Sequence, residues 1–276
     1  MPFLSLTTWS LHRNLGPLRW TDWNEETGQQ VTRIEDQPET LSLLELPFEL
    51  AKQGFRALEV CHFHFPSTDQ DYLLKFKNVL NKSGVNFHCL LVDYGDISNA
   101  NHERRSSDIE YIKKWINIAS TVGAKSVRVV AGEADASDQE ALSRAKEALS
   151  LLVDYAASRN VRIVTENFKS LAATKENCRE LLMAREREIG LTVDFGNFKR
   201  EEKYEAIQSL MPYAESIHAK ANYDNKGIID EEEYRKSLAI VASSGYEGPI
   251  TLVYDGPGDL WKGIERIKAV VKPYCN

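Results

Sequence analysis

Short β-branched segments alternate with longer amphipathic segments along the chain. Between the β-branched segments, apolar residues recur at i, i+3, i+4 and i+7, which is the period of a helix packed on one face. Gly or Asn follows most of these helical segments, as at Gly84, Gly123 and Asn160, where a positive φ ends a helix. Eight segments have the composition of buried strands, namely 3–9, 57–63, 86–92, 126–132, 161–167, 190–196, 215–221 and 250–256.

Eight strand–helix repeats favour a parallel sheet that closes on itself. Right-handed crossovers place each helix outside the sheet, and eight such units form a (β/α)₈ barrel. The alternative is an open doubly wound sheet, which usually has a glycine-rich phosphate turn that this sequence lacks. We therefore expect an α/β fold, a single TIM-barrel domain over residues 1–276. Residues 16–40 are the longest irregular stretch, expected as a loop insertion after the first strand that covers the carboxyl ends of the strands.

Composition disfavours several classes of protein. The chain has 34 Lys and Arg against 41 Asp and Glu, and its net charge of −7 argues against nucleic acid or an anionic membrane as partner. The N-terminal sequence does not have the pattern of a signal peptide, and no apolar run reaches the ~18 residues of a membrane helix. We therefore expect a cytoplasmic protein. The four cysteines have no metal-binding or redox spacing, and no ATP or NAD fingerprint is present.

Polar and ionisable residues gather at the carboxyl ends of the expected strands, where barrel enzymes hold their sites. Unpaired buried charges are costly, so several of them on one rim indicate a shared ligand or ion. In chain order these residues are His12, Glu59, His62, His64, Asp93, Arg128, Glu166, Asn167, Asp194, Asn197, His218, Lys220 and Asp255.

Side chains alternate between the two faces of a strand, and this alternation selects the rim residues that can meet. If the relevant faces of the last four strands point inward, Glu166, Asp194, His218 and Asp255 converge. Carboxylate oxygens with one imidazole nitrogen suit Mn²⁺, Mg²⁺, Co²⁺ or Zn²⁺. The alternative is structural, with the carboxylates paired to basic residues of the rim and His218 serving as a core histidine.

The same strands carry the motifs ENF at 166–168, TVDFGNF at 192–198, SIHAKA at 216–221 and YDGPGD at 254–259, supported by GAKSVRVVAG at 123–132. In this order and spacing, over nearly the whole chain, they resemble the xylose-isomerase-like barrel superfamily of sugar and sugar-phosphate isomerases and epimerases. The resemblance implies one divalent metal ion held by Glu166, Asp194, His218 and an acid on the last strand.

The chain departs from that family pattern on its last strand. Relatives typically read Glu-x-Glu before Gly-Pro-Gly, whereas this sequence reads Val253-Tyr254-Asp255. Asp255 lies on the same face as Val253 and substitutes for the missing acid directly or through a water. Alternatively, the site has three protein ligands, or is weak or absent. Phe168 is a second departure, because relatives often have His at this position.

The resemblance implies a metal-dependent isomerase or epimerase that acts on a sugar or sugar phosphate through an enediolate intermediate. Glu166 is the expected base, Asp255 is its partner, and Lys220 neutralises an oxyanion or binds a phosphate. A sugar-acid lyase or dehydratase and a degenerate, non-catalytic sugar-binding barrel remain as alternatives. Apurinic-site endonucleases share the fold, but they carry additional His and Asp ligands and their DNA substrate is opposed by the negative charge.

Several residues of the rim and of the 16–40 stretch are expected to bind the carbohydrate. The histidines orient sugar hydroxyls or are ordinary rim residues, and Arg128 anchors a phosphate or carboxylate or bridges to Glu166 or Glu59. Trp20 and Trp23 stack on a sugar face or pin the loop to the barrel. Whether the chain forms a homo-oligomer is left open. The expected substrate-binding residues are His12, Trp20, Glu59, His62, His64, Arg128 and Asn197.

Overall fold

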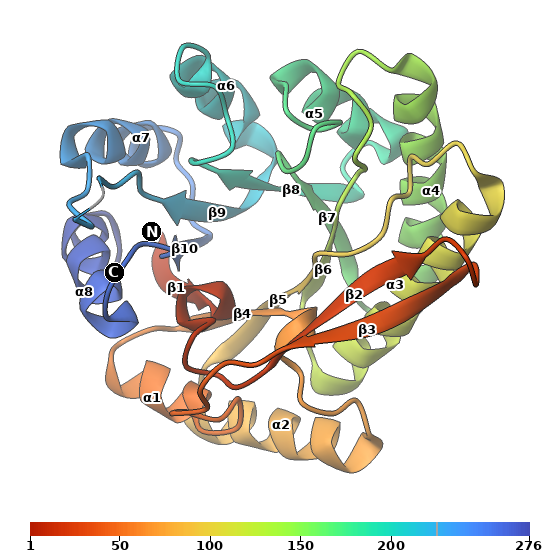
Figure 1. The fold of residues 1–276 in the computed structure, drawn as a ribbon. Coiled ribbons are helices and arrows are strands. Elements are labelled where there is room, and N and C mark those ends of the chain that lie inside the picture. The colour runs from red at the N-terminus through yellow and green to blue at the C-terminus, as the bar shows by residue number, and fades with distance from the viewer. Residues whose placement is uncertain (225) are drawn as a thin grey trace.

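The computed structural model, which describes residues 1–224 and 226–276, contains a closed barrel of eight parallel strands surrounded by helices (Figure 1). The order of strands around the barrel is β1-β10-β9-β8-β7-β6-β5-β4. Each expected strand segment overlaps one barrel strand, and the predicted (β/α)₈ fold is confirmed. The strands are β1 Phe3–Thr7, β4 Ala57–Cys61, β5 Asn86–Val92, β6 Ser126–Val129, β7 Arg162–Glu166, β8 Ile189–Asp194, β9 Ala214–Lys220 and β10 Pro249–Val253.

Helices α2 and α3 end at glycines that the sequence marked, and α4 and α8 each begin after a capping aspartate. Gly84 and Gly123 follow α2 and α3 with φ of 74° and 84°, conformations that cost glycine little. Asp138 and Asp259 precede α4 and α8, and their side chains accept hydrogen bonds from the first turns. The helices are α1 Leu46–Lys52, α2 Gln70–Ser83, α3 His102–Val122, α4 Gln139–Ala157, α5 Lys175–Leu182, α6 Lys203–Leu210, α7 Glu231–Ser243 and α8 Leu260–Val271.

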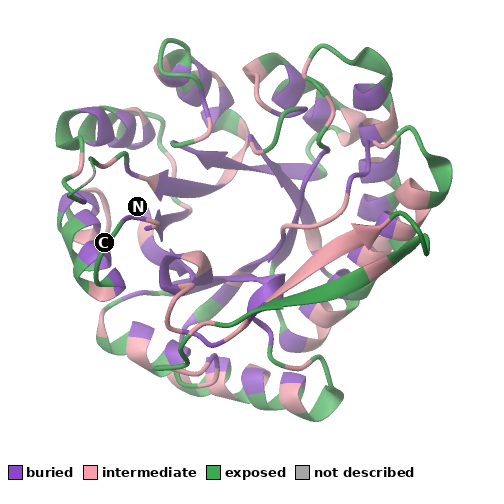
Figure 2. Ribbon diagram, in the orientation of Figure 1, coloured by how far each residue is buried: buried purple, intermediate pink, exposed green. Residues whose placement is uncertain are grey.

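The apolar core has two parts because each strand of the barrel is buried on both faces. Figure 2 shows buried strands and helices that bury one side each. The larger part, to which Leu58 and Val60 of β4 belong, includes residues of the strands and of the surrounding helices. A smaller cluster contains Cys61, Phe63 and Leu91, residues that line the cavity described below. Alternate residues of one strand therefore serve the helix layer and the barrel interior.

Residues 16–40 differ from the irregular loop that the sequence suggested. They contain an antiparallel hairpin of β2, Leu18–Asn24, and β3, Gln29–Glu35. The hairpin was missed because β3 is largely exposed and so shows no alternation of apolar and polar residues. It runs from the rim of the barrel toward α3 (Figure 1). There, the Thr21 and Tyr111 hydroxyls form a hydrogen bond of 2.7 Å.

The helices of the described residues differ in length and in hydropathy. Among these described helices, none is both long enough and apolar enough to cross a membrane.

Candidate metal centre and its pocket

A cavity of about 280 Å³ opens at the carboxyl ends of the barrel strands. Its polar residues come mostly from β6–β10 and the loops that follow them, whereas most of its apolar residues come from β1, β4, β5 and the hairpin. The polar residues include Asp93, Arg128, Glu166, Lys169, Asp194, Asn197, His218, Lys220 and Asp255, and the larger apolar residues are Trp9, Trp20, Phe63, Leu91, Phe168 and Val253.

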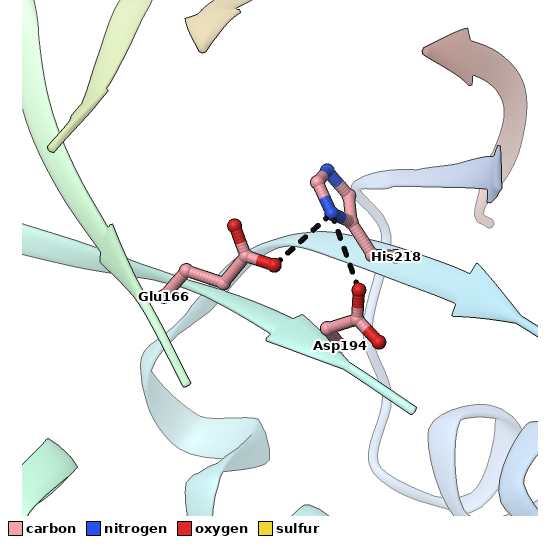
Figure 3. Close-up of side chains that lie close together, drawn as sticks. All are labelled: Glu166, Asp194 and His218. Carbon is pink, nitrogen blue, oxygen red and sulfur yellow. Dashed lines mark ion pairs between the residues drawn. The ribbon is translucent and has the colours of Figure 1, made fainter. Parts of the chain in front are cut away.

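Three of the four expected metal ligands meet at the bottom of this cavity. Glu166, Asp194 and His218 lie on the neighbouring strands β7, β8 and β9, and one ligand atom of each lies within 4.8 Å of the other two. The Nδ1 atom of His218 is 3.4 Å from Oε1 of Glu166 and 3.6 Å from Oδ2 of Asp194 (Figure 3). All three side chains are buried and aim at one point.

The arrangement of Asp194 is fixed by its neighbours. The backbone N–H of Asp194 donates to Oδ1 of Asn167 at 2.7 Å, and the Asn167 side chain donates to the Asp194 carbonyl at 2.9 Å. The N–H of Gly196 donates to Oδ1 of Asp194 at 2.5 Å, which leaves Oδ2 toward His218. The ENF and TVDFG motifs are therefore tied together at the ends of β7 and β8.

Charge and spacing around His218 indicate what the cluster can hold. Burial opposes a charged imidazole, but the carboxylates of Glu166, Glu59 and Asp194 outweigh it and raise the pKa of His218 well above its ordinary value. The Nδ1–oxygen separations of 3.4 and 3.6 Å exceed those of good N–H···O hydrogen bonds, which are about 2.7–3.2 Å. Two ligands that each lie ~2.1 Å from one ion stand ~3.0–3.4 Å apart. The donor set and its spacing therefore fit a divalent cation.

Arg128 holds the other oxygen of Glu166. Its Nε lies 3.0 Å from Oε2 of Glu166, and its Nη2 lies 2.5 Å from Oδ1 of Asp93. Burial opposes the charged guanidinium, but these two carboxylates outweigh it and raise the pKa of Arg128. The Phe168 ring lies over the guanidinium, with its centroid 5.3 Å away. Of the roles considered for Arg128, the bridge to Glu166 is present, and the same side chain also lines the cavity.

Asp255, the fourth expected ligand, lies outside the group of three. Its Oδ2 is 2.6 Å from Nζ of Lys220, on the rim of the cavity. Burial opposes the charged ammonium, but Asp255 and Asp194 outweigh it and raise the pKa of Lys220. Val253, at the position of the first acid in the family pattern, is 4% exposed and lines the cavity. In this structure, the cluster has three protein ligands and an apolar neighbour.

The three histidines expected to bind substrate are not among the described residues that line the cavity. His12 stacks on Trp9 with ring centroids 4.4 Å apart, and its Nδ1 donates to the Trp9 carbonyl at 2.8 Å. His62 accepts a hydrogen bond from the backbone N–H of Asp93 at 3.2 Å, and Nδ1 of His64 is hydrogen-bonded to Thr8 at 2.8 Å. Burial lowers the pKa of His62 to about 4 and that of His64 to about 3, so both are neutral at pH 7.

The remaining expected residues divide between the cavity and the layer beneath it. Trp20 and Asn197 line the cavity, and Nδ2 of Asn197 lies 3.4 Å from Oε1 of Glu166. Glu59 is fully buried under His218 and does not line the cavity. Trp23 lies 5.8 Å from the guanidinium carbon of Arg104 on α3, so it anchors the hairpin.

Two aromatic residues of the cavity were not singled out from the sequence. Phe63 and Trp9 form its apolar wall together with Trp20, with ring centroids of Phe63 and Trp20 4.3 Å apart. Phe63 has the same parity as Glu59 and Cys61 in the expected strand 57–63, so alternation could have pointed to the interior, although in the structure Phe63 lies in the 3-10 helix His62–His64 after β4.

Comparison with known proteins places this geometry in a family. The sequence model described as "Xylose isomerase-like TIM barrel" matches residues 48–270. A comparison with curated protein sequences found no match.

Solved structures share the fold at low sequence identity. A D-tagatose 3-epimerase-like protein has a TM-score of 0.70 at 17% identity, covering 99% of this chain and 98% of its own. The probable 3-DHS dehydratase of petrobactin synthesis from Bacillus anthracis has a TM-score of 0.69 at 15% identity, covering 98% of each chain. A xylose isomerase-like TIM barrel protein from Mycobacterium smegmatis in complex with magnesium has a TM-score of 0.68 at 15% identity, covering 99% of this chain and 96% of its own. With a closed barrel and a family model that matches most of its length, the chain belongs to the xylose isomerase-like TIM barrel family.

Proposed function

We propose that the chain is a metal-dependent isomerase or epimerase of a sugar or sugar phosphate, and that it acts through an enediolate intermediate. The observation that carries this proposal is the convergence of Glu166, Asp194 and His218 within 4.8 Å at the bottom of a polar cavity. The D-tagatose 3-epimerase-like protein and the magnesium complex, which share the fold, support it. Glu166, Asp194 and His218 are the proposed metal ligands.

A bound divalent cation would supply Lewis-acid stabilisation of negative charge on a substrate carbonyl oxygen. The chain itself supplies the groups that orient the sugar and move protons. Glu166 is the proposed base on the β7 side, where Arg128 at 3.0 Å and Asn197 at 3.4 Å set the direction of its carboxylate. Lys220, held as an ammonium by Asp255, lines the same cavity, where it can neutralise a developing oxyanion.

The aromatic wall serves the other side of the sugar. Trp20 and Phe63 present apolar faces opposite the charged residues of β7–β9, an arrangement suited to a sugar ring with one apolar and one hydroxylated face. Trp20 is itself fixed by a hydrogen bond of 2.9 Å from its Nε1 to Glu35 on β3.

One observation favours a second candidate, a lyase or dehydratase of a sugar acid. Epimerisation by proton exchange on two faces needs two acid–base groups, whereas elimination of water begins with a single proton abstraction. Val253 stands where the family has an acid, so of the carboxylates around His218 the two that line the cavity are Glu166 and Asp194, and Glu166 is the proposed base. The likeness of the fold to that of the probable 3-DHS dehydratase supports this candidate.

The test combines metal analysis with a substrate panel. Purified protein is analysed for bound metals, then incubated with ketoses, aldoses, their phosphates and sugar acids in the presence of Mn²⁺, Mg²⁺, Co²⁺ or Zn²⁺. An isomerase or epimerase exchanges a substrate C–H with deuterium from solvent, and a dehydratase releases water and forms an unsaturated product. Glu166→Gln should abolish either reaction. A protein that binds none of these metals, and whose turnover is unchanged by Glu166→Gln, would refute the proposal.

A further inference from the structure

Glu59 is an acidic side chain that the proposed chemistry leaves without a role. It lies in the middle of β4, its side chain is 0% exposed, and it does not line the cavity. A buried carboxylate is expensive unless its oxygens receive hydrogen bonds. Replacing a buried ionic pair with apolar side chains of similar volume is often neutral or stabilising, so fold stability alone does not account for this residue.

Both oxygens of Glu59 are occupied by defined donors. Oε1 accepts from the Ser216 hydroxyl at 2.5 Å and from the Thr251 hydroxyl at 2.8 Å. Oε2 accepts from Nε2 of His218 at 2.7 Å. A carboxylate accepts hydrogen bonds only, so the two hydroxyls act as donors and leave Oε2 to the imidazole. The carboxylate is thereby held in one orientation by residues of β9 and β10.

The two ring nitrogens of His218 therefore contact different carboxylates. Its Nε2 faces Glu59 below the cavity, and its Nδ1 faces Glu166 and Asp194 at 3.4 and 3.6 Å. Figure 3 shows the ring edge that carries Nδ1 turned toward both carboxylates. A neutral imidazole donates from one nitrogen and offers a lone pair on the other. Donation from Nε2 to Glu59 leaves the lone pair on Nδ1.

We propose that Glu59 is a positioning residue, which fixes the tautomer and ring orientation of His218 so that Nδ1 presents its lone pair to a divalent cation shared with Glu166 and Asp194. This inference rests on the proposed function, because it requires a cation at that point. The negative charge behind the ring makes Nδ1 a better donor, as carboxylate partners of metal-binding histidines generally do. The residue acts through His218 and does not touch the substrate.

The experiment compares two buried carboxylates. Glu59→Gln removes the charge with almost no change in volume, and Asp108→Asn does the same at a fully buried position on α3. Asp108 accepts hydrogen bonds from the Asp96 N–H at 2.9 Å and from Gln30 at 3.2 Å, and it belongs to neither the cavity nor the ligand group. Mn²⁺ affinity is measured by calorimetry for both variants and for the unmodified chain, with thermal unfolding recorded for each.

Glu59→Gln should weaken Mn²⁺ binding about 10–100-fold, the range for outer partners of metal-binding histidines. Asp108→Asn should leave the dissociation constant within about twofold even where it lowers thermal stability by a similar amount. A second readout is the ¹⁵N spectrum of the Zn²⁺-loaded chain, in which the His218 Nε2 proton should show a strong hydrogen bond that Glu59→Gln removes.

The outcomes separate this inference from the proposed function. Unchanged Mn²⁺ affinity in a folded Glu59→Gln variant, with normal binding by the unmodified chain, overturns the positioning role and leaves the metal site in place. Equal weakening by Glu59→Gln and Asp108→Asn also overturns it, because general destabilisation then explains the effect. Failure of the unmodified chain to bind Mn²⁺, Mg²⁺, Co²⁺ or Zn²⁺ overturns both proposals.

Discussion

Histidines stand at the carboxyl ends of β4 and β9, and the structure gives them opposite environments. His218 of β9 is surrounded by the carboxylates of Glu59, Glu166 and Asp194, which raise its pKa and aim one of its nitrogens into the cavity. His62 and His64, just after β4, are packed among aromatic rings and hydrogen-bonded to the backbone or to Thr8. The same residue type is a candidate ligand in one place and a neutral core residue in the other.

The difference follows from local backbone geometry rather than from composition. Cys61 at the end of β4 lines the cavity, and in the 3-10 helix His62–His64 that follows, Phe63 lines the cavity whereas His62 and His64 do not. On β9, Ser216, His218 and Lys220 share the inward face. Position at a strand end is thus insufficient to predict a site residue, and the face of the strand must be established as well.

The largest expected effect separates the two kinds of histidine. We expect His218→Gln to weaken Mn²⁺ binding more than 100-fold, because it removes the nitrogen donor at the centre of the cluster. The matched variant His64→Gln should change the dissociation constant less than about threefold, since His64 does not line the cavity. Calorimetric titration checks both variants. A comparable loss of Mn²⁺ affinity in His64→Gln would contradict the assignment of His218 as a ligand and His64 as a core residue.

The stability of the metal-free chain should report on the β4 histidines. Their pKa values, about 4 for His62 and about 3 for His64, lie below the 6.5 of an exposed histidine because burial disfavours the charged ring. Between pH 6.5 and 4 the unfolded chain therefore binds more protons than the folded chain. Stability should be fully present above pH 6.5 and decline as the pH falls, by ~1.4 kcal/mol per pH unit for each histidine.

Urea unfolding at several pH values between 7 and 4 measures this slope. The control is His64→Gln, in which the slope should be smaller by the contribution of one histidine, while other titrating groups still contribute. An unchanged slope in that variant would mean that His64 does not titrate as a buried neutral ring.

A smaller effect is expected where the family pattern is broken. Val253→Glu restores an acid beside the cluster, on the strand next to His218, and should tighten Mn²⁺ binding about tenfold by adding a fourth ligand, a third carboxylate, to Glu166, Asp194 and His218. Val253→Gln is the control of the same size without the charge. If both variants fold and neither tightens binding, position 253 does not face the cation.

The smallest effect concerns the aromatic wall. Trp20→Ala should raise KM by about 5–10-fold and change kcat little, because the lost contact stabilises substrate and transition state alike. Trp23→Ala on the same hairpin should leave KM nearly unchanged, since Trp23 packs near Arg104 of α3. Steady-state kinetics with the substrate found in the panel provide the test, and a fall in kcat alone would place Trp20 nearer the reacting atoms.

The sequence predicted the barrel well because all eight strands alternate with amphipathic helices. It also indicated that Glu166, Asp194 and His218 would meet, because side-chain alternation places each of them on the inward face of one of three neighbouring strands. It failed for the hairpin, where the exposed β3 strand has no apolar face to reveal it. It could not place Asp255, because the choice between the cluster and Lys220 depends on backbone direction after β10, beyond the reach of periodicity.

The hairpin has a consequence for how such a pocket can change. β2 and β3 pair with each other in a sheet of their own, outside the hydrogen-bonded ladder of the barrel, yet Trp20 lines the cavity. Insertions or exchanges in the hairpin can thus change the part of the cavity wall that Trp20 forms without shifting the register of any barrel strand. Replacing the hairpin with the equivalent segment of a homologue would be a way to change ligand preference while the cluster of Glu166, Asp194 and His218 is left unaltered.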